Sequence, residues 1–119
     1  MSLEPTMDRA ALEKLRALGG VPLLTKMIDL FLENTPKRIA AAQGGEKSGD
    51  WYEVERAAHS LKSSAANLGL TDLQSLAREI EDLAERRQSE KVGPLLLELE
   101  SRFPAVKVRL EEEKRAAHA

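Results

Sequence analysis

Core-facing positions recur every three or four residues in four stretches of the chain. The clearest stretch runs from Trp51 to Leu68 with steps of 3, 4, 3, 4 and 3. This spacing predicts amphipathic helices that pack in a bundle, because it brings a side chain to the same face on each turn. The positions are Leu24, Ile28, Phe31, Thr35, Ile39 and Ala42; Trp51, Val54, Ala58, Leu61, Ala65 and Leu68; Leu73, Leu76, Ile80 and Leu83; and Val92, Leu96, Leu99, Phe103, Val106 and Leu110.

A short extra helix is predicted before the first of these stretches. It runs from about Asp8, whose side chain suits an N-cap, to about Leu18. Gly19 and Gly20 then end it, since paired glycines favour a turn. Pro22 fits the first turn of the helix that follows.

The third helix is predicted to be bounded by recognisable start and stop signals. Glycines at 44–49 mark the loop before it, and Asp50 is its expected N-cap. Gly69 is the expected glycine just past its end. Thr71 then caps the fourth helix, with Gln74 at the reciprocal position of a capping box.

Prolines and charge shape the expected ends and bends of the remaining helices. A loop at 89–93 is predicted before Pro94, which suits the first turn of a fifth helix. Pro36 and Pro104 lie inside helical patterns, where proline removes one hydrogen bond and predicts a kink or break. The charged tail 111–119 is expected to fray.

These elements predict an all-α fold without strands. Four long amphipathic helices with short links pack most simply as an antiparallel up-down-up-down four-helix bundle, and the short extra N-terminal helix caps one end. The expected organisation is a single domain, 1–119, with a bundle core at about 21–110 and a polar tail at about 111–119.

Composition narrows the class of protein. The 119 residues include no cysteine, which excludes disulfides, thiol catalysis and cysteine-ligated metals. A net charge of −2 gives no electrostatic reason to expect nucleic-acid binding. No apolar run approaches a membrane span, and the amino terminus lacks a signal-peptide pattern, so we expect a cytoplasmic protein without a membrane partner.

One histidine stands out as a candidate for chemistry. His59 lies within the third helix, one step beyond Ala58 and therefore at the edge of the apolar stripe. The only other histidine, His118, lies in the polar tail. A lone helical histidine is most often a solvated or satisfied polar residue. The small residues that follow His59 also have a structural use, since they let helices approach closely.

The run around His59 nevertheless resembles a family signature. Ala-His-Ser-Leu-Lys-Ser-Ser-Ala-Ala-Asn-Leu-Gly is similar to the signature of histidine-containing phosphotransfer (HPt) domains, roughly His-x-Leu-Lys-Gly followed later by a glycine. The likeness extends from about Leu15 to about Leu110. One departure is Ser63, where glycine is common; serine is small enough to keep the site open.

The resemblance implies a bundle that carries a phosphoryl group between proteins. It implies that His59 is the phosphoacceptor and that Lys62 stabilises the phosphate. In several members a glutamine 22 positions downstream hydrogen-bonds the histidine; here that position is Glu81, a second departure. A carboxylate can orient the imidazole by accepting its proton, but it repels a nearby phosphate.

The expected function is that of a phosphocarrier and not an enzyme. A neutral imidazole is nucleophilic, and His59 would accept the phosphoryl group from a receiver-domain aspartate and pass it to another receiver in a two-component phosphorelay. The chain has no Gly-rich nucleotide loop and no sheet-forming segment, so we expect no cofactor of its own. The Mg²⁺ should belong to the receiver-domain partner.

The docking surface is expected to surround His59. The candidate contacts are Arg56, Lys62, Ser63, Ala66 and Asn67, together with exposed leucines of the first helix, Leu12 or Leu15. The expected partners are response-regulator receiver domains and a hybrid histidine kinase, and the expected state is a monomer, since a small interface suits a protein that releases its partners.

Three other interpretations remain open. A di-iron bundle is disfavoured, because its Glu-x-x-His pair would need a glutamate at residue 56, which is arginine. A bundle that only binds other proteins would show the same apolar stripes. The third interpretation is an HPt-like module that receives phosphate from the ATP-binding domain of a histidine kinase.

Overall fold

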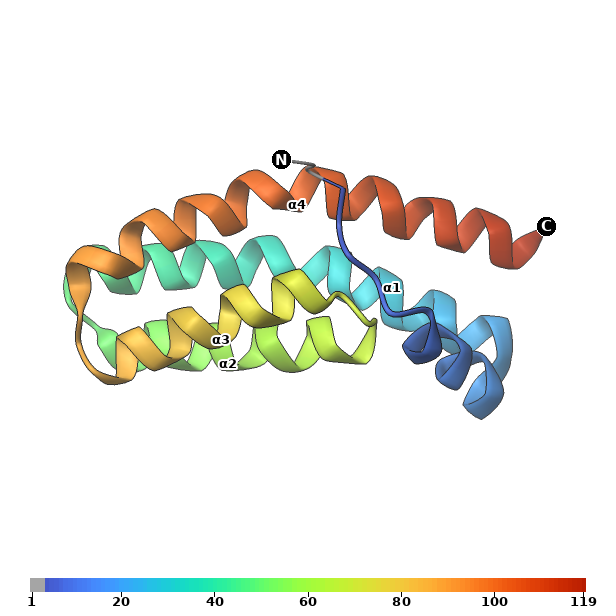
Figure 1. The fold of residues 1–119 in the computed structure, drawn as a ribbon, viewed down its shortest axis with the longest axis horizontal. Coiled ribbons are helices and arrows are strands. Elements are labelled where there is room, and N and C mark those ends of the chain that lie inside the picture. The colour runs from blue at the N-terminus through green and yellow to red at the C-terminus, as the bar shows by residue number, and fades with distance from the viewer. Residues whose placement is uncertain (1–3) are drawn as a thin grey trace.

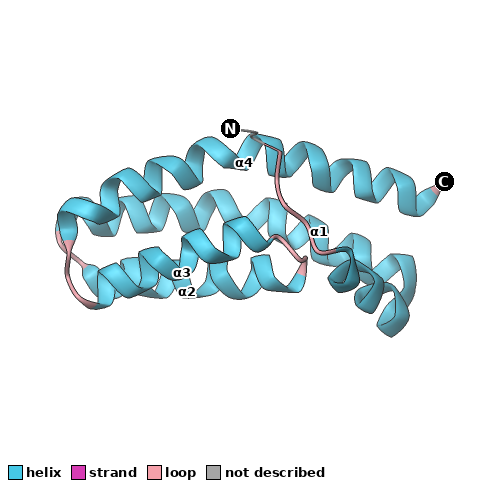
Figure 2. Cartoon of the chain, viewed as in Figure 1, coloured by secondary structure: helices cyan, strands magenta, loops and turns pink. Residues whose placement is uncertain are grey.

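The computed structural model describes residues 4–119, and these residues form four helices. They are α1 (Arg9–Ser48), α2 (Trp51–Asn67), α3 (Thr71–Glu85) and α4 (Ser89–His118). Figure 2 shows them joined by short loops, with no strand in the described part of the chain. The all-α prediction is confirmed. The first three residues of the predicted domain lie outside the described residues.

The helices pack as the corners of a bundle. Contacts join α1 to α2, α2 to α3, α3 to α4, and α4 back to α1. Neighbouring helices therefore follow one another along the chain and run in alternating directions (Figure 1). The predicted up-down-up-down arrangement is confirmed, and α2 and α4 occupy diagonally opposite corners.

The predicted short first helix is present as the N-terminal arm of α1. Asp8 caps it by accepting a hydrogen bond from the backbone of Ala10 at 3.0 Å. Gly20 then interrupts the helical backbone with φ 70° and ψ −166°. Glycine adopts this positive φ readily, and the non-helical backbone at Gly20 changes the direction of the chain. The arm therefore lies beside the end of the bundle (Figure 1).

The loop predicted at residues 44–49 begins later than expected. α1 continues to Ser48, and only Gly49, with φ 78°, turns the chain. Gly45 is a buried helical residue, where a Cβ would stand 2.9 Å from the carbonyl oxygen of Asp50 and 3.0 Å from Val54 Cγ2. This glycine permits the close approach of α2 to α1 rather than a loop.

The turn between α2 and α3 confirms one prediction and corrects another. Gly69 has φ 72° and lies one residue past the C-cap, as predicted. Thr71 is not a side-chain cap, since Leu70 occupies the N-cap position and no side chain caps the helix. Instead, the backbone N–H of Thr71 donates to the carbonyl of Thr6 at 3.2 Å. The N-terminal segment therefore supplies a hydrogen-bond acceptor at the start of α3, where the sequence had predicted a side-chain cap.

α1 continues through Pro36, and α4 continues through Pro94 and Pro104. α4 begins at Ser89, so the predicted loop at 89–93 is helical and Pro94 lies inside the helix rather than in its first turn. α4 also passes through Pro104, and α1 leaves helical geometry only at Gly20, not near Pro36. Buried residues lie on both sides of Pro36, Pro94 and Pro104, so the helix packs against the core before and after each proline.

The charged tail is helical to His118, so the prediction that it frays is wrong. Glu113 is buried, with its carboxylate 2.7 Å from Arg9 and 3.3 Å from Arg109. Lys114 Nζ lies 2.6 Å from Asp29 Oδ1. The pairs that Glu113 makes with Arg9 and Lys114 makes with Asp29 dock the end of α4 against α1. The charge of these residues along the sequence does not reveal such contacts.

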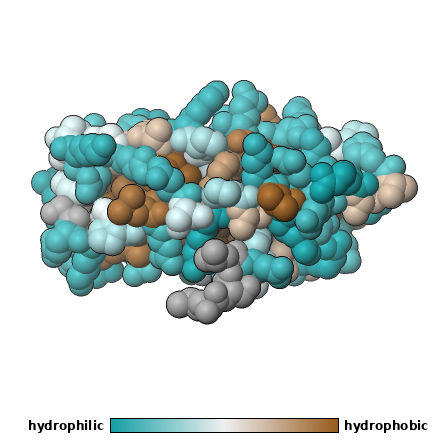
Figure 3. Space-filling view, turned by 90° about the horizontal axis from the view of Figure 1, so that it is seen from above, coloured by the Kyte–Doolittle hydropathy of each residue, from teal (hydrophilic) through white to brown (hydrophobic). Residues whose placement is uncertain are grey.

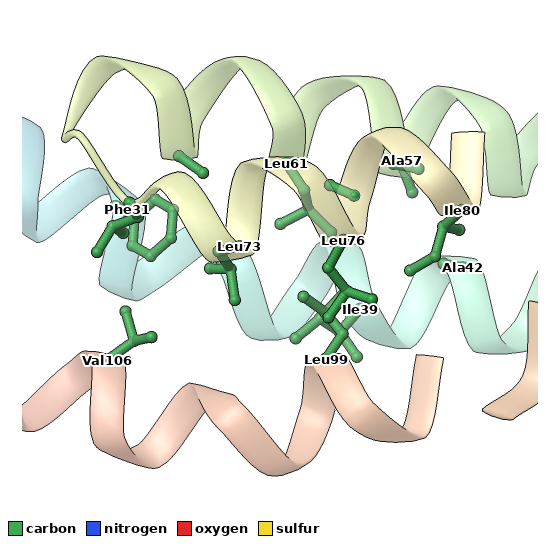
Figure 4. Packing of buried hydrophobic residues seen from close by; sticks show 14 of the residues in the cluster. Phe31, Ile39, Ala42, Ala57, Leu61, Leu73, Leu76, Ile80, Leu99 and Val106 are labelled. Carbon is green, nitrogen blue, oxygen red and sulfur yellow. The ribbon is translucent and has the colours of Figure 1, made fainter. Parts of the chain in front are cut away.

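The core is built mainly from leucine, isoleucine, valine and alanine of all four helices, and it also includes Phe31. Figure 4 shows Ile39 of α1, Leu61 of α2, Leu76 of α3 and Leu99 of α4 pointing into the shared interior. Leu61 and Leu99 are 1% and 0% exposed. Burial of such side chains stabilises the fold by about 2 kcal/mol each, and it fixes which side of α2 faces outward.

Candidate functional site

His59 lies on the side of α2 that faces away from the core. Because each residue of an α-helix turns by about 100°, the buried residues of α2 direct His59 toward solvent. Its side chain is 61% exposed, so a visiting protein can reach the imidazole. The predicted exposure is confirmed. The buried residues of α2 are Val54, Ala57, Ala58, Leu61 and Ala65.

A carboxylate on α3 lies between the two other predicted site residues. Glu81 Oε2 is 2.8 Å from His59 Nδ1, and Glu81 Oε1 accepts a hydrogen bond from Lys62 Nζ at 2.6 Å. The Glu81 side chain is only 14% exposed, so it is held between the helices. The structure therefore joins all three residues in one polar chain, His59–Glu81–Lys62.

Two features of the α2–α3 pair bring these residues together. The backbone N–H groups of Gly69 and Leu70 donate to the carbonyls of Ala66 and Ala65, which closes the end of α2 and reverses the chain. Small buried residues then allow the helices to approach closely. These residues are Ala58 and Ala65 of α2 and Ala77 and Ala84 of α3, all at most 1% exposed.

The hydrogen bonds to Glu81 determine its charge. Burial raises the pKa of Glu81, but the hydrogen bonds from Lys62 and His59, together with their charges, outweigh that effect and lower the pKa below its ordinary value of 4.5. Glu81 is therefore ionised at neutral pH and acts only as an acceptor.

The ionised carboxylate also fixes the hydrogen of the imidazole. With Glu81 as acceptor, Nδ1 of a neutral His59 must carry the hydrogen, which leaves the lone pair on Nε2. No residue in the described part of the chain hydrogen-bonds Nε2. Nε2 is therefore the nitrogen with the free, nucleophilic lone pair, and it belongs to an exposed ring. Glu81 holds that ring by its other nitrogen, Nδ1.

The predicted docking residues of α2 surround the imidazole. Arg56, Ser63 and Asn67 are exposed, and Ala66 is half-buried. The Arg56 guanidinium lies 5.7 Å from the centre of the Tyr52 ring, a cation–π arrangement on the same helix. The surface beside His59 therefore presents small side chains and the Arg56 guanidinium, which also lies 3.9 Å from the Glu53 carboxylate.

The two leucines predicted to extend this surface differ. Leu12 is 2% exposed, so the expectation that it is an exposed contact is wrong. It packs into the core because the arm before Gly20 folds back on the bundle. Leu15 is half-buried and packs against the same core.

Sequence reasoning missed a polar contact between α1 and α2. Arg38 donates a hydrogen bond to Ser64 Oγ at 3.0 Å, at the edge of a groove of about 160 Å³ that also includes Asn34 and Asn67. The four-residue spacing of Asn34 and Arg38 placed both on one side of α1. The sequence did not indicate which helix would face that side.

The described residues hold neither a metal-ligating cluster nor a membrane-spanning helix. Residues 4–119 contain no group of three or more metal-ligating side chains close enough to hold an ion. In the same part of the chain, none of the helices combines the length and the apolar character that crossing a bilayer demands.

Comparison with known families and proteins gives a consistent result. The sequence model described as the Hpt domain matches residues 26–118. Over 85 residues, the chain is 27% identical to the sensory/regulatory protein RpfC of Xanthomonas campestris pv. campestris, in strains ATCC 33913 and 8004. That alignment covers 71% of this chain but only 12% of those relatives.

Two solved structures share the fold. Histidine-containing phosphotransfer protein B (HptB) of Pseudomonas aeruginosa PAO1 superposes with a TM-score of 0.86 at 22% identity, over 94% of this chain and 96% of that one. The HPT domain of the Hpt sensor hybrid histidine kinase of Shewanella gives a TM-score of 0.73 at 20% identity, over 90% and 92%. At these identities the likeness establishes the arrangement of helices.

Proposed function

We propose that this chain, which belongs to the Hpt domain family, has a phosphotransfer role in phosphorelays and that His59 is the residue that carries the phosphoryl group. The observation that supports this most directly is the state of the imidazole. The ring is 61% exposed, its Nδ1 is held by Glu81 Oε2 at 2.8 Å, and its Nε2 faces no hydrogen-bonding partner among the described residues.

The proposed reaction is attack by His59 Nε2 on the phosphorus of an aspartyl phosphate in a receiver domain. The N–P bond forms as the P–O bond to the aspartate breaks, and the aspartate leaves as a carboxylate. The ring retains the hydrogen on Nδ1 and gains positive charge, which faces the Glu81 carboxylate. Transfer to a second receiver reverses these steps.

Glu81 and Lys62 have different parts in this proposal. Glu81 orients the ring and fixes its tautomer without touching the phosphoryl group, so it is a positioning residue. Lys62 neutralises the Glu81 carboxylate while the ring is unmodified. As negative charge arrives on His59, the Lys62 ammonium lies one helical turn away and offsets the repulsion between phosphate and carboxylate.

The partners proposed for this reaction are receiver domains and a hybrid histidine kinase. The chain would act as a carrier without catalytic activity of its own, and the receiver would supply the Mg²⁺ that assists transfer. Arg56, Ser63, Ala66 and Asn67 would line the docking surface, because they lie on the same exposed side of α2 as His59.

A second donor remains a candidate. The chain is similar to 12% of the length of a sensory/regulatory protein, and one structural neighbour is a domain of a sensor hybrid kinase. A domain in that context can receive phosphate from an ATP-binding kinase domain. We therefore propose testing receivers and kinase domains as separate donors.

The decisive experiment incubates the chain with phosphorylated receiver domains and Mg²⁺ and measures acid-labile phosphate on it. We expect labelling of the wild type and none of His59→Gln. His118→Gln is the matched control, because it removes the only other histidine. It should be labelled like the wild type.

Two results would contradict the proposal. Phosphate retained by His59→Gln would mean that another residue is modified. A wild-type chain that no receiver and no kinase domain labels would favour a bundle that only binds other proteins. Labelling by a kinase domain alone would favour the second donor.

A further inference from the structure

The outer side of α4 carries exposed apolar residues that the proposed phosphotransfer does not use. Leu97 is 64% exposed and Val108 is 57% exposed. Pro94, Ser101 and Pro104 lie on the same side of the helix, because the steps between these positions are three or four residues. We call these five residues the α4 outer face. Figure 3, which views the molecule from above α4, shows apolar side chains interrupting a hydrophilic surface.

This face lies away from the phosphotransfer site. α4 contacts α1 and α3, whereas His59 is on α2 at the opposite corner of the bundle. A protein bound to the α4 outer face would therefore leave the imidazole accessible. The face is independent of the function proposed for His59.

The charges that flank the face are complementary under a two-fold rotation. Glu100 and Lys107 are seven residues apart, so they lie on the same flank of α4 about two turns from each other. An antiparallel second copy, with the axis between Arg102 and Phe103, places Leu97 of one chain against Val108 of the other. It also brings Lys107 of each chain beside Glu100 of its partner.

A groove next to Leu97 provides room for the opposing side chains. It has a volume of about 560 Å³ and lies between the end of α1 and the start of α4. Glu46 and Glu100 supply carboxylates to its lining, and Pro94, Leu96 and Leu97 supply apolar surface. The antiparallel arrangement directs Val108 and Lys107 of the second copy to this groove. Val108 then meets its apolar lining, and Lys107 meets its carboxylates.

We propose that the α4 outer face binds a second copy of this chain as an antiparallel two-fold dimer, whereas the sequence alone led us to expect a monomer. Such an interface is isologous: each copy contributes the same residues, and every contact occurs twice. Its contacts come mainly from one helix of about 45 Å in each copy, so the dimer is of the weak, concentration-dependent kind. Both copies keep His59 exposed.

The first test measures the mass of the chain by sedimentation over about a hundredfold range of concentration, where mass action reveals a weak dimer. We expect the wild type to pass from monomer to dimer. Leu97→Glu and Val108→Glu should each raise the dissociation constant at least tenfold. Leu18→Glu is the matched control, since Leu18 is 71% exposed on the α1 arm and should change nothing.

Charge reversal tests the arrangement itself. Glu100→Lys and Lys107→Glu should each weaken the dimer, because each places like charges together, and the double variant should restore it. Unfolding curves recorded in parallel check that each variant is folded. Glu100 also accepts a hydrogen bond from Gln43 at 2.9 Å, so a folding defect in Glu100→Lys would shift that curve.

Cross-linking distinguishes antiparallel from parallel pairing, since the chain has no cysteine. A mixture of Leu97→Cys and Val108→Cys chains should form a disulfide much faster than either variant alone. Faster self-linking of each variant would indicate a parallel pair and overturn the proposed geometry. A monomer at every concentration, or a dimer unaffected by Leu97→Glu and Val108→Glu, would overturn the proposal and leave the phosphotransfer function unaffected.

Discussion

The two histidines of this chain are both hydrogen-bonded, yet their surroundings differ. His59 lies in the middle of α2, and its Nδ1 is 2.8 Å from a carboxylate held between two helices. His118 lies in the last turn of α4, and its Nε2 is 3.1 Å from the hydroxyl of Thr25. Exposure alone does not distinguish them, since both rings are at the surface.

The difference lies in how firmly each ring is oriented. Glu81 is an acceptor only, so it fixes the hydrogen of His59 on Nδ1 and the lone pair on Nε2. The Thr25 hydroxyl can donate or accept, so it leaves the tautomer of His118 open. A histidine becomes a directed nucleophile when a buried, charged neighbour holds it from the side opposite to its free nitrogen.

The largest expected effect on phosphotransfer comes from a bulky side chain that covers the approach to His59 and leaves His118 uncovered. Ala66→Trp places a large side chain on the exposed side of α2 beside His59, and we expect receiver-dependent phosphorylation to fall at least a hundredfold, about 3 kcal/mol in the barrier. Ala116→Trp, at an exposed position in the last turns of α4, is the control and should transfer normally.

A small phosphodonor separates docking from chemistry in the Ala66→Trp variant. Phosphoramidate should still label His59, since it needs no protein interface. Equal loss with phosphoramidate and with receivers would mean that the tryptophan disturbs the imidazole itself. Normal transfer from receivers would place the docking surface elsewhere.

The next effect concerns the orientation of the ring. Glu81→Ala removes the acceptor of Nδ1, and we expect the transfer rate to fall by about tenfold to a hundredfold, as misplacement of a reacting group commonly does. Thr25→Val removes the partner of His118 and should leave the rate unchanged. Single-turnover kinetics with a phosphorylated receiver measures both, and an unchanged rate in Glu81→Ala would mean that the carboxylate is not needed for positioning.

A smaller effect should appear in the dependence of stability on pH. The pKa of Glu81 is lower in the folded chain than its ordinary value of 4.5, so its ionised form favours folding. This contribution of Glu81 to stability is fully present when the pH is above the ordinary pKa of 4.5. It is lost as the pH falls through the lower pKa of the folded chain. Glu81→Gln cannot titrate, and its free energy of unfolding should change less than that of the wild type over this acid range. Parallel curves from denaturant unfolding would contradict this.

The smallest effect is expected at the far end of the molecule. Lys114→Ala breaks the ion pair with Asp29, whose two side chains are 31% and 54% exposed, so the loss of stability should be about 1 kcal/mol or less. The rate of phosphotransfer should not change. Thermal unfolding and the single-turnover assay together test this, and a slower transfer would mean that the end of α4 communicates with His59.

Much of the fold could be predicted because local signals agreed with one another. The apolar spacing in α2 predicted which residues are buried, and Ala58, Leu61 and Ala65 are all at most 1% exposed. Asp50 accepts a hydrogen bond from the backbone of Glu53 at 3.1 Å, as expected of an N-cap. Gly69 turns the chain after α2.

Three of the incorrect predictions share a physical cause. The loop around Gly45, the cap at Thr71 and the fraying of the C-terminal tail were each inferred from local preference. In the structure another segment supplies the contact that local preference did not include: the start of α2 packs against Gly45, the carbonyl of Thr6 accepts from the N–H of Thr71, and Arg9 pairs with Glu113. Tertiary contacts outweigh the modest energies of local preference.

By itself, the sequence determined the helices, the side of α2 on which His59 lies, and the family signature around it, because these depend on residue spacing along one helix. Only the tertiary structure decided that Glu81, 22 residues away, holds Nδ1 while it also binds Lys62. That arrangement depends on the close packing of α2 against α3, which sets atomic distances that periodicity cannot specify.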